Sequence, residues 1–451
     1  MARLFGTDGV RGLANTKITP ELALSLGLAA ARWLHEHQAR SDGEKPRAIV
    51  GRDTRISGEF LSAAVAAGLA SGGVDVTRVG IVPTPAVAFL TASQDVDLGV
   101  VISASHNPMQ DNGIKFIARS GYKLDDAVED QLEALLGKPW DRPTGGGVGD
   151  IHRDVSRADH AYVEHLVRAV GSKSLRGLRI AVDCANGAAS QVGPWALREA
   201  GADVVVMNAS PDGENINKSC GSTHPEQLQA VTVASGADFG VAYDGDADRC
   251  LAVDATGKLV DGDQIMGLLA MGMKEEGTLV DDTLVVTVMS NLGLKLAMRE
   301  AGIQTIQTAV GDRYVLEEML RGGYSLGGEQ SGHVIASQFA TTGDGILTSM
   351  LLGARLKETG TSLAQLAGKI KRLPQTLINV SGVDKARATQ DEELAGAIEK
   401  AEAFLGDSGR VLLRPSGTEP LVRVMVEART QEEADAVAQR LAAVVKERLA
   451  L

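Results

Sequence analysis

The feature of this sequence that most restricts its fold is a pattern that occurs three times along the chain. Each copy has an apolar strand, a helix, a second strand and helix, and a third strand that leads into a polar loop. The first strands lie at residues 48–53, 180–183 and 285–288, and the helices after them at 58–72, 188–201 and 292–302. Alternating strands and helices form sheets of mainly parallel strands covered by helices. The pattern predicts three similar α/β domains with mixed, mostly parallel sheets.

The loops that end the three copies are expected to form one site. They are glycine-rich or polar and lie at residues 103–108, 244–249 and 327–333. In open α/β sheets, ligands bind beyond the carboxyl ends of the strands, and each of these loops follows a strand at that end. We therefore expect each domain to contribute one loop to a shared central cleft.

The last part of the chain departs from the pattern. A basic, proline-containing linker at 369–375 precedes a strand at 377–380, a helix at 392–404, two strands around 414–417, and a helix that follows Thr430. This order predicts a smaller C-terminal α+β domain. Thr430 and Glu433 have the spacing of a capping box, in which each side chain accepts a hydrogen bond from the other residue's amide.

The predicted domains and their loops follow from these elements. They are 1–153 with the loop of Ser105, 154–255 with the loop of Asp244, 256–370 with the loop of Glu329, and 374–451.

Composition excludes several classes of protein. The formal net charge of −13 argues against a nucleic-acid surface, which needs basic patches. The three cysteines form no CxxC pair, which is typical of a reducing compartment. The apolar stretches are shorter than a membrane span, and the glycine-rich motif near residue 5 leaves no room for a signal peptide. We expect a soluble cytoplasmic protein with no nucleic-acid or membrane partner.

Three alternating aspartates, Asp244, Asp246 and Asp248, indicate a metal site. Clustered carboxylates repel one another, and a hard divalent cation is their natural partner. An EF-hand would need glycine and glutamate where this chain has Arg249 and Ala255, so a calcium loop of that kind is rejected. A solvated acidic turn is the alternative, but the apolar strand expected at 239–243, immediately before the loop, favours metal.

Ser105 and His106 follow the strand expected at 98–102. The chain has no GxSxG elbow, which weakens an acyl-hydrolase function, and no Walker A or GxGxxG motif for nucleotides. Taken alone, a serine here is more often a turn residue, and a histidine more often part of the scaffold. The residues by themselves leave catalysis open.

Basic and polar groups near the glycine-rich loops suit a small phosphorylated ligand. Arg11, Lys115 and Arg249 belong to the first two domains. The C-terminal domain offers arginine forks, hydroxyls and free amides, which bind phosphate well: Arg414, Ser416, Gly417, Thr418 and Arg423. A polar hairpin turn is the alternative for this last segment.

Six segments together resemble the α-D-phosphohexomutase family, and they stand in family order across almost the whole chain. They are FGTDGVRG (5–12), GRDTRISG (51–58), ISASHNPMQDNGIKF (102–116), DGDADR (244–249), GGEQSGH (327–333) and RPSGTEPLVR (414–423). Any one segment could occur by chance, whereas the ordered set is highly specific.

The resemblance implies a four-domain enzyme with a central cleft, one Mg²⁺ per chain and a sugar 1,6-bisphosphate as activator. It matches Ser105 to the family's phosphorylated serine, whose oxygen completes the metal shell of Asp244, Asp246 and Asp248. The residues matched to proton transfer or to the charge of the transition state are Arg11, Lys115 and His333, and His106 and Arg249 join them as catalytic candidates. Glu329 and Ser331 match residues that hold sugar hydroxyls, and 414–423 matches the loop for the non-reacting phosphate.

The wording of two motifs resembles the branch of the family that interconverts glucosamine 6-phosphate and glucosamine 1-phosphate. These are FGTDGVRG and the GGEQSGH segment that contains Gln330. A phosphomannomutase or phosphoglucomutase activity is the alternative, since those enzymes would share the same catalytic residues. A phosphatase and a non-catalytic sugar-phosphate-binding protein are weaker alternatives. The partner is a phosphosugar, and the chain is expected to be a monomer or a homodimer.

Overall fold

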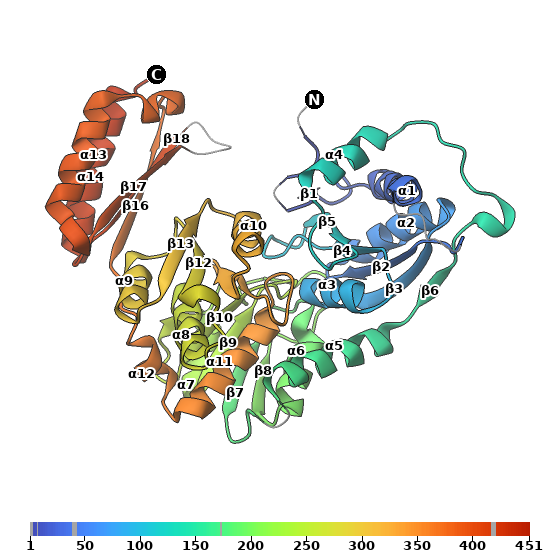
Figure 1. The fold of residues 1–451 in the computed structure, drawn as a ribbon, viewed down its shortest axis with the longest axis horizontal. Coiled ribbons are helices and arrows are strands. Elements are labelled where there is room, and N and C mark those ends of the chain that lie inside the picture. The colour runs from blue at the N-terminus through green and yellow to red at the C-terminus, as the bar shows by residue number, and fades with distance from the viewer. Residues whose placement is uncertain (1–2, 7, 38–42, 172–173, 416–420) are drawn as a thin grey trace. The chain divides into compact units, whose positions relative to one another are not determined.

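The computed structural model describes residues 3–6, 8–37, 43–171, 174–415 and 421–451 (Figure 1). The chain divides into two compact units. The larger comprises Met1–Met289 and Ile303–Ala367, and the smaller comprises Ser290–Gly302 and Gly368–Leu451. Within the described ranges, no helix combines the length and the apolar character that crossing a bilayer requires.

A six-stranded sheet in the order β1-β5-β4-β2-β3-β6 opens the larger unit. Its strands are β1 (Val10–Leu13), β2 (Arg47–Arg52), β3 (Asp75–Ile81), β4 (Leu98–Ile102), β5 (Asp111–Ala118) and β6 (Ile151–Arg153). Its helices are α1 (Pro20–His37), α2 (Ser57–Ser71), α3 (Thr84–Ser93) and α4 (Asp126–Leu135). Helices α1 and α2 pack closely because Gly27 and Gly68 face each other's backbone, where a Cβ atom would collide with a carbonyl oxygen.

Two further sheets complete the larger unit. The second has the order β11-β10-β9-β7-β8, and the third has the order β13-β12-β14-β15. The second sheet's strands are β7 (Arg179–Asp183), β8 (Asp203–Met207), β9 (Phe239–Tyr243), β10 (Cys250–Asp254) and β11 (Leu259–Val260). The third sheet's strands are β12 (Thr283–Thr287), β13 (Gln304–Thr308), β14 (Leu326–Gly328) and β15 (Val334–Ala336). The helices are α5 (Val155–Val170), α6 (Ala189–Glu199), α7 (Glu226–Ala234), α8 (Gly262–Glu275), α10 (Asp312–Gly322), α11 (Gly345–Thr359) and α12 (Leu363–Ala367).

The three sheets share one four-stranded core, which confirms the predicted repeat. The cores are β3-β2-β4-β5, β8-β7-β9-β10 and β13-β12-β14-β15, with three parallel strands and an antiparallel fourth. Each predicted loop connects the last parallel strand to the antiparallel one. The same step of the same fold therefore positions all three loops.

The smaller unit has the predicted α+β character. Its antiparallel sheet has the order β16-β18-β17. The strands are β16 (Gln375–Ser381), β17 (Arg410–Pro415) and β18 (Leu421–Glu427), and the helices are α9 (Leu292–Glu300), α13 (Glu392–Leu405) and α14 (Gln431–Arg448). Figure 1 shows α13 and α14 side by side along the sheet.

Two details of the smaller unit refine the expectations. Thr430 Oγ1 accepts a hydrogen bond from the amide of Glu433 at 3.2 Å, which is one half of the expected capping box. Helix α9, which the repeat places in the third domain, groups with the C-terminal residues: the amide of Leu292 donates to Glu427 Oε2 at 2.8 Å.

Candidate active site

Ser105 lies in the loop after the fully buried strand β4. Its backbone adopts a left-handed conformation, with φ of 51°. This conformation is unfavourable for residues other than glycine and is concentrated at functional sites. The Ser105 hydroxyl donates to Asp244 Oδ2 at 2.5 Å and lies 3.3 Å from His106 Nδ1. The serine is 1% exposed, so protein atoms rather than solvent surround its side-chain oxygen.

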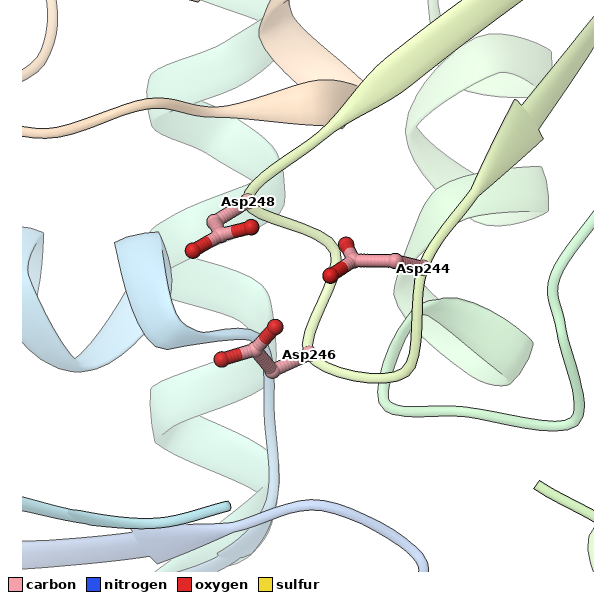
Figure 2. Close-up of side chains that lie close together, drawn as sticks. All are labelled: Asp244, Asp246 and Asp248. Atoms are coloured by element: carbon pink, nitrogen blue, oxygen red, sulfur yellow. The ribbon is translucent and has the colours of Figure 1, made fainter. Parts of the chain in front are cut away.

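The three aspartates of the loop between β9 and β10 converge on one point. One oxygen from each of Asp244, Asp246 and Asp248 lies within 4.8 Å of the others, and all three residues are buried. Figure 2 shows the carboxylates pointing toward one another from this loop. Ala247, between two of them, has a left-handed φ of 57°, which turns the loop so that its alternating side chains meet.

The donor set fits a metal ion. Asp246 Oδ1 and Asp248 Oδ1 are buried without a hydrogen-bond partner among the described residues. Burial and the charges of Asp248 and Asp246 raise the pKa of Asp244 well above its ordinary value. Carboxylates this close cannot all stay ionised without a compensating cation. The buried triplet is therefore a candidate metal-binding site, built from the three aspartates that the sequence analysis singles out.

Lys115 joins this loop to the N-terminal motif. Its Nζ atom lies 3.1 Å from Asp246 Oδ2 and 2.9 Å from Asp8 Oδ2. Burial lowers the pKa of Lys115, but the carboxylates of Asp246 and Asp8 outweigh burial and raise it. Asp8 also forms an ion pair with Arg11, whose Nη1 reaches the carbonyl of Ala104 at 3.5 Å. Lys115 and Arg11 are thus fixed as cations beside the Ser105 loop.

His106 stays neutral in this surrounding. Burial, together with the charges of Arg249 and Arg11, lowers its pKa to about 4. A neutral imidazole can accept a proton at a ring nitrogen that faces Ser105 Oγ and can then return that proton.

The third loop meets the aspartate loop through Arg249 and His333, whose backbones form an antiparallel bridge. His333 Nε2 lies 4.0 Å from Asp248 Oδ2, and Arg249 Nε lies 3.9 Å from Asp248 Oδ1. Gly343 leaves room for the buried imidazole, because a Cβ atom there would lie 2.5 Å from the ring. The structure therefore brings His333 and Arg249 to the edge of the metal site.

Glu329 and Ser331 lie in the same loop as His333. Glu329 Oε1 accepts a hydrogen bond from the amide of Gly311 at 3.1 Å. Ser331 Oγ is buried and makes no hydrogen bond within the described part of the chain. A buried hydroxyl without a hydrogen-bond partner is suited to a polar ligand.

The remaining predicted residues belong to the smaller unit. Arg414 and Arg423 are directly opposite each other on β17 and β18, so their side chains lie on one face of the sheet. Two guanidinium groups on one face of a sheet can donate together to one anion. Ser416, Gly417 and Thr418 fall outside the described residues.

Sequence reasoning missed several residues that contact the site. Thr84 Oγ1 donates to Asp246 Oδ2 at 2.7 Å, although no motif surrounds Thr84. Asn217 Nδ2 donates to the carbonyl of Ser105 at 2.9 Å, again without a sequence signal. Asp8 and Arg55 do lie within recognised segments, FGTDGVRG and GRDTRISG, whose charged members could have drawn attention.

Comparison with known proteins identifies the family. Four models of phosphoglucomutase/phosphomannomutase domains match in order: α/β/α domain I at 2–140, domain II at 160–257, domain III at 261–373 and the C-terminal domain at 377–444. A phosphoglucosamine mutase from Bifidobacterium animalis subsp. lactis is 62% identical over 100% of both chains. Another from a Nocardioides species is also 62% identical over 100% of both chains.

A solved structure gives the same result. The phosphoglucomutase/phosphomannomutase family protein from Burkholderia thailandensis has a TM-score of 0.81 and 25% identity, over 99% of this chain and 98% of that one. With four domains matched and full-length relatives above half identity, the chain is an enzyme of the phosphoglucomutase/phosphomannomutase family, the α-D-phosphohexomutases.

Proposed function

We propose that this enzyme interconverts glucosamine 6-phosphate and glucosamine 1-phosphate through a phosphorylated Ser105 and a sugar bisphosphate. The observation that carries the proposal is the contact of the Ser105 hydroxyl with the buried carboxylate triplet, at 2.5 Å from Asp244. A hydroxyl held against a metal site suits phosphoryl transfer, which depends mainly on positioning and on charge stabilisation.

The proposed metal is one Mg²⁺, held by Asp244, Asp246, Asp248 and an oxygen of the phosphorylated Ser105. A set of oxygen ligands of this kind suits a hard cation. When bound, the ion would supply positive charge against the phosphoryl oxygens.

The chemistry consists of two half-reactions. In the first, the 1-hydroxyl oxygen of glucosamine 6-phosphate bonds to the phosphorus on Ser105 as the bond from that phosphorus to Oγ breaks. The sugar hydroxyl loses its proton, and Oγ gains one. In the second, Oγ bonds to the phosphorus of the 6-phosphate, the sugar oxygen leaves, and the proton moves in the opposite direction. Free glucosamine 1,6-bisphosphate would activate the enzyme by the second half-reaction alone.

Proton movement at Ser105 Oγ is assigned to His106, because its Nδ1 lies 3.3 Å away. Arg11, Lys115 and Arg249 supply fixed positive charge around the phosphoryl group. His333, buried beside Asp248, is assigned to the sugar side of the reaction.

Substrate binding is assigned to two places in the chain. Glu329 and Ser331 would hold the sugar hydroxyls, which fits the buried Ser331 hydroxyl that makes no hydrogen bond in the described residues. Arg414 and Arg423 would hold the non-reacting phosphate, together with Ser416, Gly417 and Thr418. The register of β17 and β18 supports this assignment, because it puts two guanidinium groups on one face of the sheet, where both can donate to one phosphate.

The choice of glucosamine rests on the full-length relatives named phosphoglucosamine mutase. A coupled assay of purified enzyme with Mg²⁺ tests it, with glucosamine 6-phosphate, glucose 6-phosphate and mannose 6-phosphate as competing substrates. We expect the largest kcat/KM for the glucosamine phosphate and some turnover of glucose phosphate, because one substituent often changes affinity by only about 1–3 kcal/mol. A larger kcat/KM for either neutral hexose would contradict the proposal. Release of free phosphate at the rate of substrate loss would indicate a phosphatase.

A further inference from the structure

The carbonyl side of the Ser105 loop faces one buried arginine that the mechanism above does not use. Arg55 follows strand β2, and its side chain is fully buried with that of Asp53, to which Nε donates at 2.9 Å. The rest of its guanidinium donates to four backbone oxygens of the loop. These are the oxygens of Ser105 at 2.9 Å, Asn107 at 2.8 Å, Asp111 at 3.1 Å and Pro108.

A second donor reaches the same loop from the second domain. Asn217 Nδ2 donates to the oxygens of Ser105 and Asn107, at 2.9 Å and 3.1 Å. Gly245 closes the remaining side, because a Cβ atom there would lie 2.5 Å from the Ser105 oxygen and 2.9 Å from Asn217 Nδ2. Two side chains from two domains therefore hold the same pair of carbonyl groups.

These contacts fix the conformation that Ser105 needs. A serine with φ of 51° does not stay in the left-handed region by its own preference. Because the peptide group is planar, holding the Ser105 carbonyl also fixes the plane that joins it to His106. The carbonyl then points to Arg55 and Asn217, while the hydroxyl of the same residue points to Asp244. The Ser103 hydroxyl extends this support, donating to Asp53 and accepting from the Ser105 amide.

We propose that Arg55, with Asn217, is a positioning residue for phosphoryl transfer: it holds the Ser105 loop so that Oγ meets the phosphorus in line. The inference rests on the proposed function of Ser105. Arginine suits the task because its planar fork carries five donors, whereas a lysine at the same place is a single point of charge.

The variants separate positioning from stability. Arg55→Lys keeps the charge beside Asp53 but loses the fork. Asn217→Ala leaves the Asp53–Arg55 pair intact and removes two donors from the loop. Arg355→Lys is the matched control, since Arg355 is also largely buried and paired with a carboxylate, Glu275, away from the Ser105 loop. Each variant is compared with wild type by thermal unfolding, by kcat and KM, and by intact mass during incubation with glucosamine 1,6-bisphosphate.

For Arg55→Lys we expect kcat to fall about 10²-fold with little change in KM. A misplacement of a reacting atom by about 1 Å can have an effect of this size. For Asn217→Ala we expect at least roughly a tenfold fall, because the variant removes two neutral hydrogen bonds to the loop. The rate at which Ser105 gains phosphate should fall by the same factors, while Arg355→Lys leaves it unchanged.

A wild-type kcat in Arg55→Lys would overturn the inference. So would a fall in kcat that is no larger than the fraction of unfolded protein accounts for. If Arg55→Lys fails to fold, Asn217→Ala decides: wild-type kcat in that variant overturns it. A wild-type enzyme that gains no phosphate on Ser105 would instead contradict the proposed function.

Discussion

The hydroxyl of Ser105 lies 2.5 Å from Oδ2 of Asp244, although 139 positions separate the two residues in the chain. The contact joins the loop after β4 to the loop after β9, the same step in two copies of one fold. Each loop contains a residue in the left-handed region, Ser105 and Ala247, at the point where the chain must turn. The proposed nucleophile and the metal site therefore depend on both domains being correctly placed.

The metal site is tested by Asp246→Asn and by chelation. Asp246 accepts from Thr84 and contacts Lys115, so the amide removes a ligand charge and disturbs its neighbours. We expect apparent metal affinity to fall at least about tenfold and activity to vanish in a chelator. Exposed Asp203→Asn is the control and should titrate with metal as wild type does. Full activity after prolonged chelation would refute a metal role for the triplet.

Asp8 is expected to act through the cations that it holds. Asp8→Asn weakens the ion pairs to Lys115, Lys123 and Arg11 while the fold is kept. We expect kcat to fall by about 10–10²-fold, because each charge-assisted contact contributes more than a neutral one. Asp130→Asn, at an exposed ion pair with Arg3 in the same domain, should leave kcat unchanged. If the two substitutions change kcat equally, Asp8 has no specific role in catalysis.

Arg423→Ala tests the phosphate-binding role of the smaller unit. Loss of a charge-assisted contact costs about 1.5–3 kcal/mol, so KM should rise roughly 10- to 150-fold. Phosphate on Ser105 should be retained, since the chemistry belongs to the larger unit. Arg440→Ala is the control, because Arg440 lies over Phe404 on the helices of the same unit. An unchanged KM with loss of the phosphoserine would contradict the assignment.

Asp159 predicts a pH dependence of stability. It is 5% exposed, its Oδ1 has no hydrogen-bond partner in the described ranges, and burial raises its pKa to about 6. The unfolded chain releases this proton near pH 4, so the folded state holds an extra proton between about pH 4 and 6. Stability from this group is therefore lost as pH rises through that window.

The variant Asp159→Asn has no titrating group at this position and so does not lose stability through it. The melting temperature of the variant relative to wild type should therefore increase as pH rises from 4 to 6, and the difference between the two should stay constant above about pH 6. Exposed Asp141→Asn is the control and should follow wild type at every pH. A difference between Asp159→Asn and wild type that does not change with pH would show that Asp159 titrates normally.

Much of the fold could be predicted because each strand is short, apolar and bounded by polar residues. The strands at 98–102 and 239–243 are β4 and β9 with identical bounds. The hydrogen bond between helix α9 and Glu427 could not be predicted, since it depends on tertiary packing that no local pattern encodes. The candidate site likewise contains residues that the sequence could predict and residues that it could not. Ser105 and the aspartates stand in local motifs, whereas Thr84 and Asn217 reach the site only through the arrangement of domains.

The central claim is that Ser105 carries the phosphoryl group. The most direct measurement is intact mass, with peptide mapping, of dephosphorylated enzyme after incubation with glucosamine 1,6-bisphosphate and Mg²⁺. We predict a gain of roughly 80 Da at Ser105 in wild type. Ser105→Ala should show no gain, and its turnover should fall by about three orders of magnitude or more. Phosphate at another residue, or near-wild-type turnover by Ser105→Ala, would contradict the account.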